Sequence, residues 1–206
     1  MEIKLFKQGS IRTNCYLGWD KETRLGFIVD PAFFDEEIKK YLVENNIKLE
    51  SILITHGHFD HVTGVAECQQ ATQAKIYMHP ADTEVVKKYG GLAKMADYGS
   101  IKEFKIDIEL CDNQELSIIS LKIKVIGTPG HSVGGVCFYL PAEKILFSGD
   151  TMFYHVCGRT DFEESSPEDM KISLNRLLKL VPNETRVLPG HGRETTIAEE
   201  QQYKGI

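Results

Sequence analysis

The chain has 206 residues, of which 42% are hydrophobic and 26% charged, and its formal net charge is −6. This composition is ordinary for a folded protein with a substantial core. There is no basic cluster of the kind that binds nucleic acid and no apolar run near the roughly 18 residues of a membrane span, so we expect neither partner. Residues 1–5 lack the form of a signal peptide.

The cysteines give a second bound on the class of protein. There are five, without CxxC spacing: Cys15, Cys68, Cys111, Cys137 and Cys157. An odd number without a pairing framework predicts reduced thiols and a cytoplasmic location. We interpret the first four as small buried residues. The sequence gives no indication of the oligomeric state.

The first half of the chain alternates strand-like runs with one helical segment. A helix is expected where Ile38, Tyr41 and Leu42 repeat with helical spacing behind Asp35, a suitable N-cap. The expected strands are Ile3–Phe6, Cys15–Trp19, Leu25–Val29, Ser51–Ile54 and Lys75–Met78.

Between the two halves, the segment Gly90–Lys105 has two adjacent glycines and weak periodicity. We interpret it as an ordinary loop or a helical insertion. A mobile flap over a functional site is the alternative.

The second half contains five further strand-like runs and two helices. One helix begins with Ser166 as N-cap and Pro167 at its first position, and it ends before Pro182. Its apolar face is Met170, Leu174, Leu177, Leu178 and Val181. The expected strands are Ile108–Leu110, Leu121–Ile126, Val136–Leu140, Lys144–Phe147 and Thr185–Leu188.

A final helix is expected from Thr196, with Glu199 completing a capping box. Two strand-rich halves, each followed by helices, indicate two sheets packed face to face with helices outside. We expect residues 1–206 to form one domain.

The residues from Thr55 to His61 read THGHFDH and directly follow an apolar strand. Imidazole and carboxylate groups suit zinc, iron and manganese. Residues two apart on an extended chain point the same way, so His56 and His58 can reach one metal together. Asp60 and His61 would then serve a second metal. A solvated surface loop is the alternative, but four metal-binding side chains beside an apolar strand argue against it.

Three later strands end in a similar way. Each is followed by a turn with a glycine and then by one residue of a type that binds metals, namely His131, Asp150 and His191. Donor residues at the ends of several strands converge on one edge of a sheet, which is how a rigid scaffold builds a site from distant parts of a chain.

The combination T-H-x-H-x-D-H, P-G-H, S-G-D and P-G-H-G resembles the metallo-β-lactamase superfamily over nearly the whole chain. The resemblance implies an α/β fold, a four-layer αββα sandwich. Carried over residue by residue, it also implies two metal sites: His56, His58 and His131 would hold the first metal, Asp60, His61 and His191 the second, and Asp150 would bridge both. The implied cofactors are two divalent metal ions, with zinc as first choice and iron or manganese as alternatives.

Within this superfamily, several features favour a thioester hydrolase. Asp150 stands where the best-known lactamases have Cys, and it resembles the bridging residue of hydrolases of the glyoxalase II type. The run from Cys157 to Arg159 resembles both those hydrolases and persulfide dioxygenases. The ending Pro189–Ile197 is similar to short bacterial glyoxalase II-like proteins. Gly57 stands where this family often has His.

Full-length glyoxalase II has an extra C-terminal helical domain that helps to bind glutathione. The chain ends fifteen residues after His191, so we expect it to lack that domain.

The resemblance and the residue chemistry together suggest several individual roles. Asp60 is the catalytic candidate, because it would orient the attacking hydroxide. Arg159 is a candidate to bind a substrate carboxylate, with a structural ion pair to Asp161 as the alternative. Tyr154 is a second substrate-binding candidate, with loop packing as the alternative; the same choice applies to His155.

Two further polar residues lie outside these motifs. Asp30 is expected to orient a ligand histidine or to act as a simple turn residue. His79 is interpreted as structural.

Three functional hypotheses follow from the sequence. The first is a binuclear metal-dependent hydrolase of a thioester, similar to hydroxyacylglutathione hydrolase, with a small-molecule thioester as its partner. The second is a mononuclear iron persulfide dioxygenase that uses two histidines and Asp150. The third is a non-catalytic metal-binding module, which the filling of all seven donor positions disfavours.

Overall fold

A computed structural model of the chain describes residues 1–203. The strands of the N-terminal half form one six-stranded sheet in which spatial order follows chain order. The first three strands pair antiparallel and the others parallel. They are β1 (Glu2–Gln8), β2 (Thr13–Trp19), β3 (Leu25–Val29), β4 (Lys48–Leu53), β5 (Lys75–Met78) and β6 (Ile108–Glu109).

The C-terminal half supplies a second six-stranded sheet, in the order β12-β11-β10-β9-β8-β7. Only β10 and β11 are parallel. Its strands are β7 (Glu115–Ile118), β8 (Leu121–Gly127), β9 (Val136–Leu140), β10 (Ile145–Gly149), β11 (Arg186–Pro189) and β12 (Thr195–Thr196). All ten expected strands are present. Two strands, β7 and β12, were not expected from the sequence; they are short edge strands of four and two residues.

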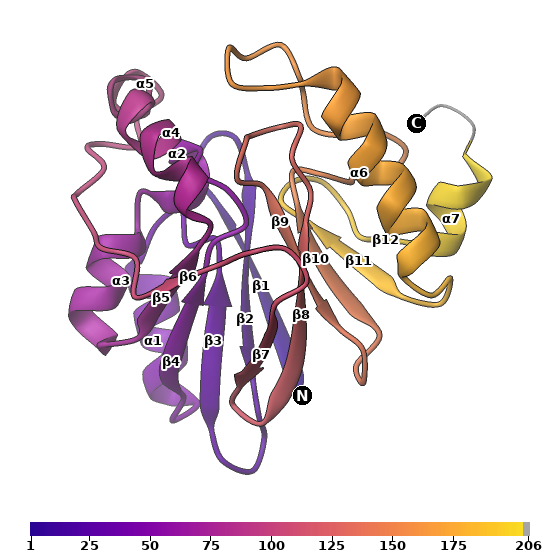
Figure 1. Cartoon of the computed structure of the whole chain (residues 1–206). Coiled ribbons are helices and arrows are strands. Elements are labelled where there is room, and N and C mark those ends of the chain that lie inside the picture. The colour runs from indigo at the N-terminus through magenta and orange to yellow at the C-terminus, as the bar shows by residue number, and fades with distance from the viewer. Residues whose placement is uncertain (204–206) are drawn as a thin grey trace.

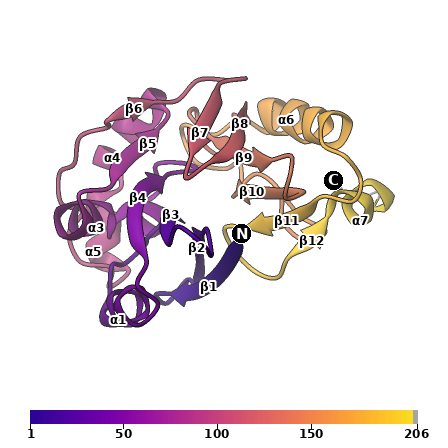
Figure 2. The same ribbon diagram turned by 90° about the horizontal axis from the view of Figure 1, so that it is seen from below.

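The two sheets face each other and helices cover their outer faces, so the expected four-layer αββα sandwich is confirmed (Figures 1 and 2). α1 (Glu36–Glu44) and α3 (Val65–Thr72) lie on the first sheet, and α6 (Pro167–Leu180) and α7 (Ile197–Gln202) on the second. Among the described residues, no helix combines the length and the apolar character that crossing a bilayer requires.

Three apolar clusters fill the spaces between these layers. Between the sheets, Phe147 contacts Tyr16 and Phe27, with ring centroids 5.4 and 5.9 Å apart. Alternate residues of the same strands point outward, where Ile28 packs beneath α1 and Leu146 beneath α6. Strands that are buried on both faces hold the turns at their ends in fixed positions.

The helix ends agree with the sequence expectations. The side chains of Asp35, Ser166 and Thr196 accept hydrogen bonds from the backbone N–H groups three residues on, at 3.1, 3.1 and 3.2 Å. Leu178 is only partly buried, whereas the other four residues of the expected apolar face of α6 are buried. All five cysteines are unpaired. Three of the four that we interpreted as buried are so, but Cys111 is exposed, because it lies in the turn before β7.

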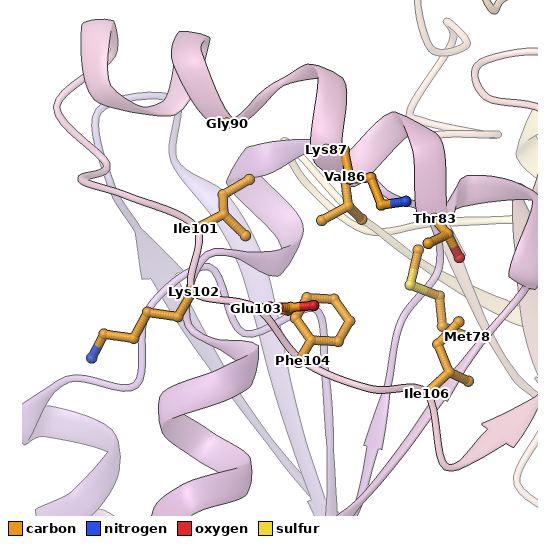
Figure 3. A pocket seen from close by; sticks show the side chains of 10 residues that line it. All are labelled: Met78, Thr83, Val86, Lys87, Gly90, Ile101, Lys102, Glu103, Phe104 and Ile106. Atoms are coloured by element: carbon orange, nitrogen blue, oxygen red, sulfur yellow. The ribbon is translucent and has the colours of Figure 1, made fainter.

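The segment between β5 and β6 forms short helices and an irregular stretch. It contains the 3₁₀ turn η1 (Pro80–Asp82), α4 (Thr83–Lys88) and α5 (Gly90–Met95), so Gly90–Lys105 begins as a helical insertion. The later part of this segment, with Ile101 and Phe104, faces α4 across a cavity of about 480 Å³ (Figure 3). None of the seven expected metal donors lines that cavity.

Candidate metal centre

The seven expected metal donors follow strands of both sheets. They lie in the turns that follow four strands. In the second sheet, β8, β10 and β11 run in the same direction, so their carboxyl ends lie at one edge. His56, His58, Asp60 and His61 follow β4, and the last two lie in the short helix α2 (Phe59–Val62). The remaining three donors follow β8, β10 and β11, and they are His131, Asp150 and His191.

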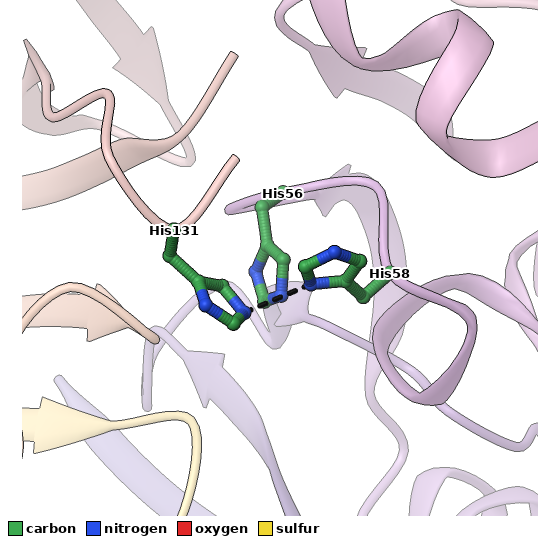
Figure 4. A group of neighbouring side chains, drawn as sticks. All are labelled: His56, His58 and His131. Carbon is green, nitrogen blue, oxygen red and sulfur yellow. Dashed lines mark hydrogen bonds between the residues drawn. The ribbon is translucent and has the colours of Figure 1, made fainter. Parts of the chain in front are cut away.

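The first group of donors consists of three buried histidines, His56, His58 and His131. One nitrogen of each lies within 4.8 Å of the other two (Figure 4). The Nδ1 atom of His58 and the Nε2 atom of His131 are 2.8 Å apart. Three nitrogens at this separation can face one metal ion.

The second group consists of Asp60, His61 and His191, whose ligand atoms also lie within 4.8 Å of one another. Asp60 Oδ2 is 3.4 Å from His61 Nε2 and 3.2 Å from His191 Nε2. The two histidine Nε2 atoms are 3.3 Å apart. Both groups are therefore compact enough to hold an ion.

Asp150 lies between the two groups. One or other of its carboxylate oxygens is 3.5 Å from the Nε2 atoms of His61, His131 and His191. Its Oδ1 atom and the Nε2 atom of His56 are buried without a hydrogen-bond partner. Buried polar atoms are rarely left unpaired, so these two atoms fit a site whose partner is a cation.

Each of these histidines turns one ring nitrogen toward the site, because its other ring nitrogen contacts an acceptor oxygen outside the site. His61 Nδ1 contacts Asp30 Oδ2 at 3.0 Å, and His131 Nδ1 contacts the Arg159 carbonyl oxygen at 2.7 Å. His58 is held in the same way, with its Nε2 atom 3.2 Å from Glu164 Oε1. Outer partners of this kind fix the ring orientation and the tautomer of metal-binding histidines.

His56 is oriented through a threonine. The Thr55 hydroxyl donates to Asp30 Oδ2 at 2.6 Å and lies 3.0 Å from His56 Nδ1. Asp30 also accepts the Thr55 N–H at 2.8 Å. Of the two alternatives for Asp30, the structure therefore supports orientation of a donor histidine, and it extends this role to the loop that carries His56.

The buried environment favours the neutral form of two histidines in the first group, His56 and His58. Burial lowers the pKa of His58 to about 4 and, with neighbouring histidines, the pKa of His56 well below its ordinary value. In the second group, burial opposes charge, but the contacts with His61 and His191 hold the pKa of Asp60 below its usual range. Neutral imidazoles and ionised carboxylates are the protonation states that bind metals.

Several supporting residues carry no motif that sequence reasoning could have used. The Thr13 hydroxyl donates to Asp60 Oδ2 at 2.9 Å. Buried Asp82 accepts the Gly57 N–H and the Ser132 hydroxyl, both at 2.7 Å, and so joins the loops of both sheets. A Cβ atom at Gly57 would lie 2.7 Å from the Asp82 carbonyl oxygen, which explains why this chain has glycine there.

The expected substrate-binding residues occupy different places. A cavity of about 520 Å³ opens onto five of the donors and is walled by Phe59, Tyr89, Phe153 and Phe162. Arg159 also lines it, but its guanidinium forms a bidentate ion pair with Asp161 at 2.6 and 2.7 Å.

Tyr154 is not among the residues that line this cavity. Its ring stacks on His155 and lies under the Arg193 guanidinium. Tyr154 and His155 thus pack against neighbouring side chains, and the substrate-binding role of Tyr154 stays a prediction. His79 caps η1 through a contact with the Ala81 N–H, as a structural residue would.

The four-layer αββα sandwich and the histidines and aspartates gathered at the shared edge of its sheets define a class of metal-dependent proteins. The family model described as the metallo-beta-lactamase superfamily matches residues 10–191. The chain belongs to this superfamily, as the sequence motifs indicated.

Two curated relatives resemble this chain over most of its length. A probable metallo-hydrolase of Bacillus subtilis, YqgX, is 30% identical over 98% of this chain and 95% of its own length. A probable polyketide biosynthesis zinc-dependent hydrolase of Bacillus velezensis, BaeB, is 34% identical over 86% of this chain and 72% of its own length.

Solved structures agree with the fold. A B3 metallo-beta-lactamase, BLEG-1, superimposes with a TM-score of 0.90 and 29% identity, covering 98% of this chain and 97% of its own. TTHA1623 in a di-iron-bound form has a TM-score of 0.84 and 34% identity, covering 97% and 98%. ETHE1 from Myxococcus xanthus has a TM-score of 0.80 and 25% identity, covering 98% and 83%. These solved structures therefore share the fold of this chain over nearly its whole length.

Proposed function

We propose that this chain is a binuclear metal-dependent hydrolase of a small-molecule thioester, similar to hydroxyacylglutathione hydrolase. The observation that carries the proposal is the position of Asp150, within 3.5 Å of donor nitrogens from both groups. A carboxylate shared in this way is suited to joining two metals in one site.

The donor set supports two divalent ions, with zinc as first choice and iron or manganese as alternatives. His56, His58 and His131 would hold the first ion, and Asp60, His61 and His191 the second. When bound, the ions would lower the pKa of a water molecule and polarise the substrate carbonyl. A relative described as zinc-dependent and a structural neighbour in a di-iron form support both choices of element.

The chain's own groups supply binding and orientation. Asp60 stays ionised at neutral pH because of His61 and His191, so it can accept a hydrogen bond from the attacking water and orient it. Water adds to the acyl carbon, the carbon–sulfur bond breaks, and a carboxylate and a thiol leave. No serine or cysteine nucleophile is needed.

The cavity walls favour an uncharged acyl group. Phe59, Phe153 and Phe162 provide apolar contacts, while the Arg159 charge is balanced by Asp161. Arg159 could still meet a substrate carboxylate at the mouth if it exchanges this partner, so its substrate-binding role stays a prediction. A cytoplasmic location also stays a prediction, supported by the unpaired thiols.

The alternative is a mononuclear iron persulfide dioxygenase that uses two histidines and Asp150. Two histidines and one carboxylate are the usual ligand set of iron oxygenases. The second group of donors, Asp60, His61 and His191, does not distinguish the two functions, because the dioxygenases that the sequence resembles keep these residues beside an empty second site. The number of metals per chain distinguishes them.

The test is metal content per chain in protein purified without added metal, combined with a substrate panel. The panel contains S-lactoylglutathione, an N-acetylcysteamine thioester with a neutral carrier, and nitrocefin as a β-lactam. About two metals with thioester cleavage is the expected result. Two metals without cleavage of either thioester would overturn the substrate class, and one iron with oxygen uptake on glutathione persulfide would establish the dioxygenase.

A further inference from the structure

The segment 159–166 contributes no metal donor, yet it contacts two histidines of the first group. The Arg159 carbonyl oxygen lies 2.7 Å from His131 Nδ1, and the Ser165 hydroxyl donates to the His131 carbonyl oxygen at 2.7 Å. The Ser166 N–H donates to the Gly130 carbonyl oxygen at 2.8 Å. These bonds fasten the segment to the loop that carries His131.

Glu164 extends from this fastened segment to the second histidine. Its Oε1 atom is 3.2 Å from His58 Nε2, the nitrogen that points away from His56 and His131. Its Oε2 atom accepts from Lys88 Nζ at 2.8 Å. The side chain of Glu164 is 10% exposed, so water competes little for either oxygen.

Glu163 provides an internal comparison. Its side chain is 87% exposed and it also binds Lys88, at 2.9 Å, but no contact joins it to a histidine. Two adjacent glutamates therefore share one lysine, and only Glu164 reaches the donor cluster.

Aromatic rings also surround His58, besides the neighbouring His56 and His131. Tyr89 and Phe162 pack edge-on or tilted against it, with ring centroids 5.1 and 4.9 Å away. Such contacts limit the tilt of the ring but do not select which nitrogen carries the proton. A carboxylate on Nε2 makes that selection, because it requires a proton there and leaves the Nδ1 lone pair free.

We propose that Glu164 is a positioning residue for the first metal: it fixes the tautomer and orientation of His58, and Lys88 at the end of α4 holds Glu164 in place. This inference rests on the metal-binding role of His56, His58 and His131 proposed above. Glu164 lies outside every recognised motif. Its role would affect the affinity of the first metal and not that of the second.

The experiment is a zinc titration of the metal-free protein against a colorimetric zinc chelator, which resolves two affinities. Glu164→Ala should weaken one zinc by about 10–100-fold and leave the other within about 2-fold, as expected for loss of an outer partner. Glu164→Gln keeps an acceptor oxygen and should show a smaller loss. Lys88→Met should cost less than about 5-fold, because its ion pairs are partly exposed.

Glu163→Ala is the matched control and should leave both affinities unchanged. Equal affinities in Glu164→Ala and Glu163→Ala, or an equal loss at both zinc sites, would overturn the inference. Two zinc ions without thioester cleavage in the wild type would overturn only the proposed substrate. No zinc binding at all would overturn both proposals. Unfolding temperatures of the metal-free variants show whether the fold is kept.

Discussion

The two donor groups differ in what holds them. His61 lies fully buried against Asp30, which also accepts two hydrogen bonds from Thr55 within the first sheet. His58 is held by Glu164, on a segment anchored to the second sheet and steadied by exposed Lys88. The support of His61 is internal and depends on one rigid sheet. The support of His58 depends on parts of the chain that meet across the cavity. The metal held through His58 should therefore be the more easily lost.

The largest effect on activity is expected from substitution of Asp150, which lies between the two donor groups. Asp150→Ala removes the carboxylate that lies between them, so both metals lose a ligand. We expect thioester cleavage to fall by more than about 100-fold, the upper end of what losing an outer partner costs. Circular dichroism should show an intact fold. Retained hydrolysis would contradict the proposed bridging role.

Asp30→Asn tests the support of His61 within the first sheet. The amide has one acceptor oxygen, so it cannot accept the Thr55 N–H at one position and the Thr55 hydroxyl and His61 at the other, and the affinity of the second metal should fall by about 10–100-fold. Asp35→Asn is the matched control, because asparagine remains a good N-cap for α1. If zinc titrations of the two variants agree, Asp30 does not orient the donors.

The pH dependence of the stability of the metal-free protein tests the charge of His61 in the second donor group. Burial disfavours the His61 cation, but Asp60 and Asp150 outweigh burial and raise the pKa of His61 to about 10. Unfolded histidine has a pKa of about 6.5, so this stabilisation is complete below about pH 6.5 and is lost as pH rises toward 10. The unfolding temperature should fall from pH 7 to 10.

His61→Gln is the control for this fall, because glutamine cannot be protonated in that range. The variant should show a shallower decline than the wild type. Parallel curves for the two proteins would mean that His61 is uncharged in the metal-free state.

The smallest effect is expected away from the donors. Ser166→Ala removes the N-cap of α6 and should cost about 1 kcal/mol of unfolding free energy. Its backbone N–H, which holds Gly130, is unchanged. Chemical denaturation measures the loss, and a zinc titration should match the wild type. A change in zinc affinity would show that the helix start, and not Glu164 alone, positions the first group.

Much of this architecture could be predicted because local signals agree with the tertiary structure. The apolar runs of β3, β4 and β10 are buried on both faces, and each ends in a turn that carries a donor or its partner. The caps at Asp35 and Ser166 follow from side-chain chemistry alone. The edge strands β7 and β12 escaped notice because short strands leave weak periodicity.

The supporting residues could not be predicted for a different reason. Thr13 and Glu164 contact donors 47 and 106 positions away, and Asp82 holds Gly57, 25 positions away, between two donors. Their roles arise only when the two sheets meet, and no local pattern encodes that. Arg159 was expected to act through its guanidinium, yet its contact with the donor cluster is through its backbone carbonyl.

The central claim is a site for two metals that share Asp150, and anomalous X-ray scattering at the zinc edge tests it most directly. Crystals of the zinc-loaded protein should show two peaks about 3.5–4 Å apart. One should lie against His56, His58 and His131, the other against Asp60, His61 and His191, with Asp150 touching both. A single peak, or two peaks without Asp150 between them, would contradict the account.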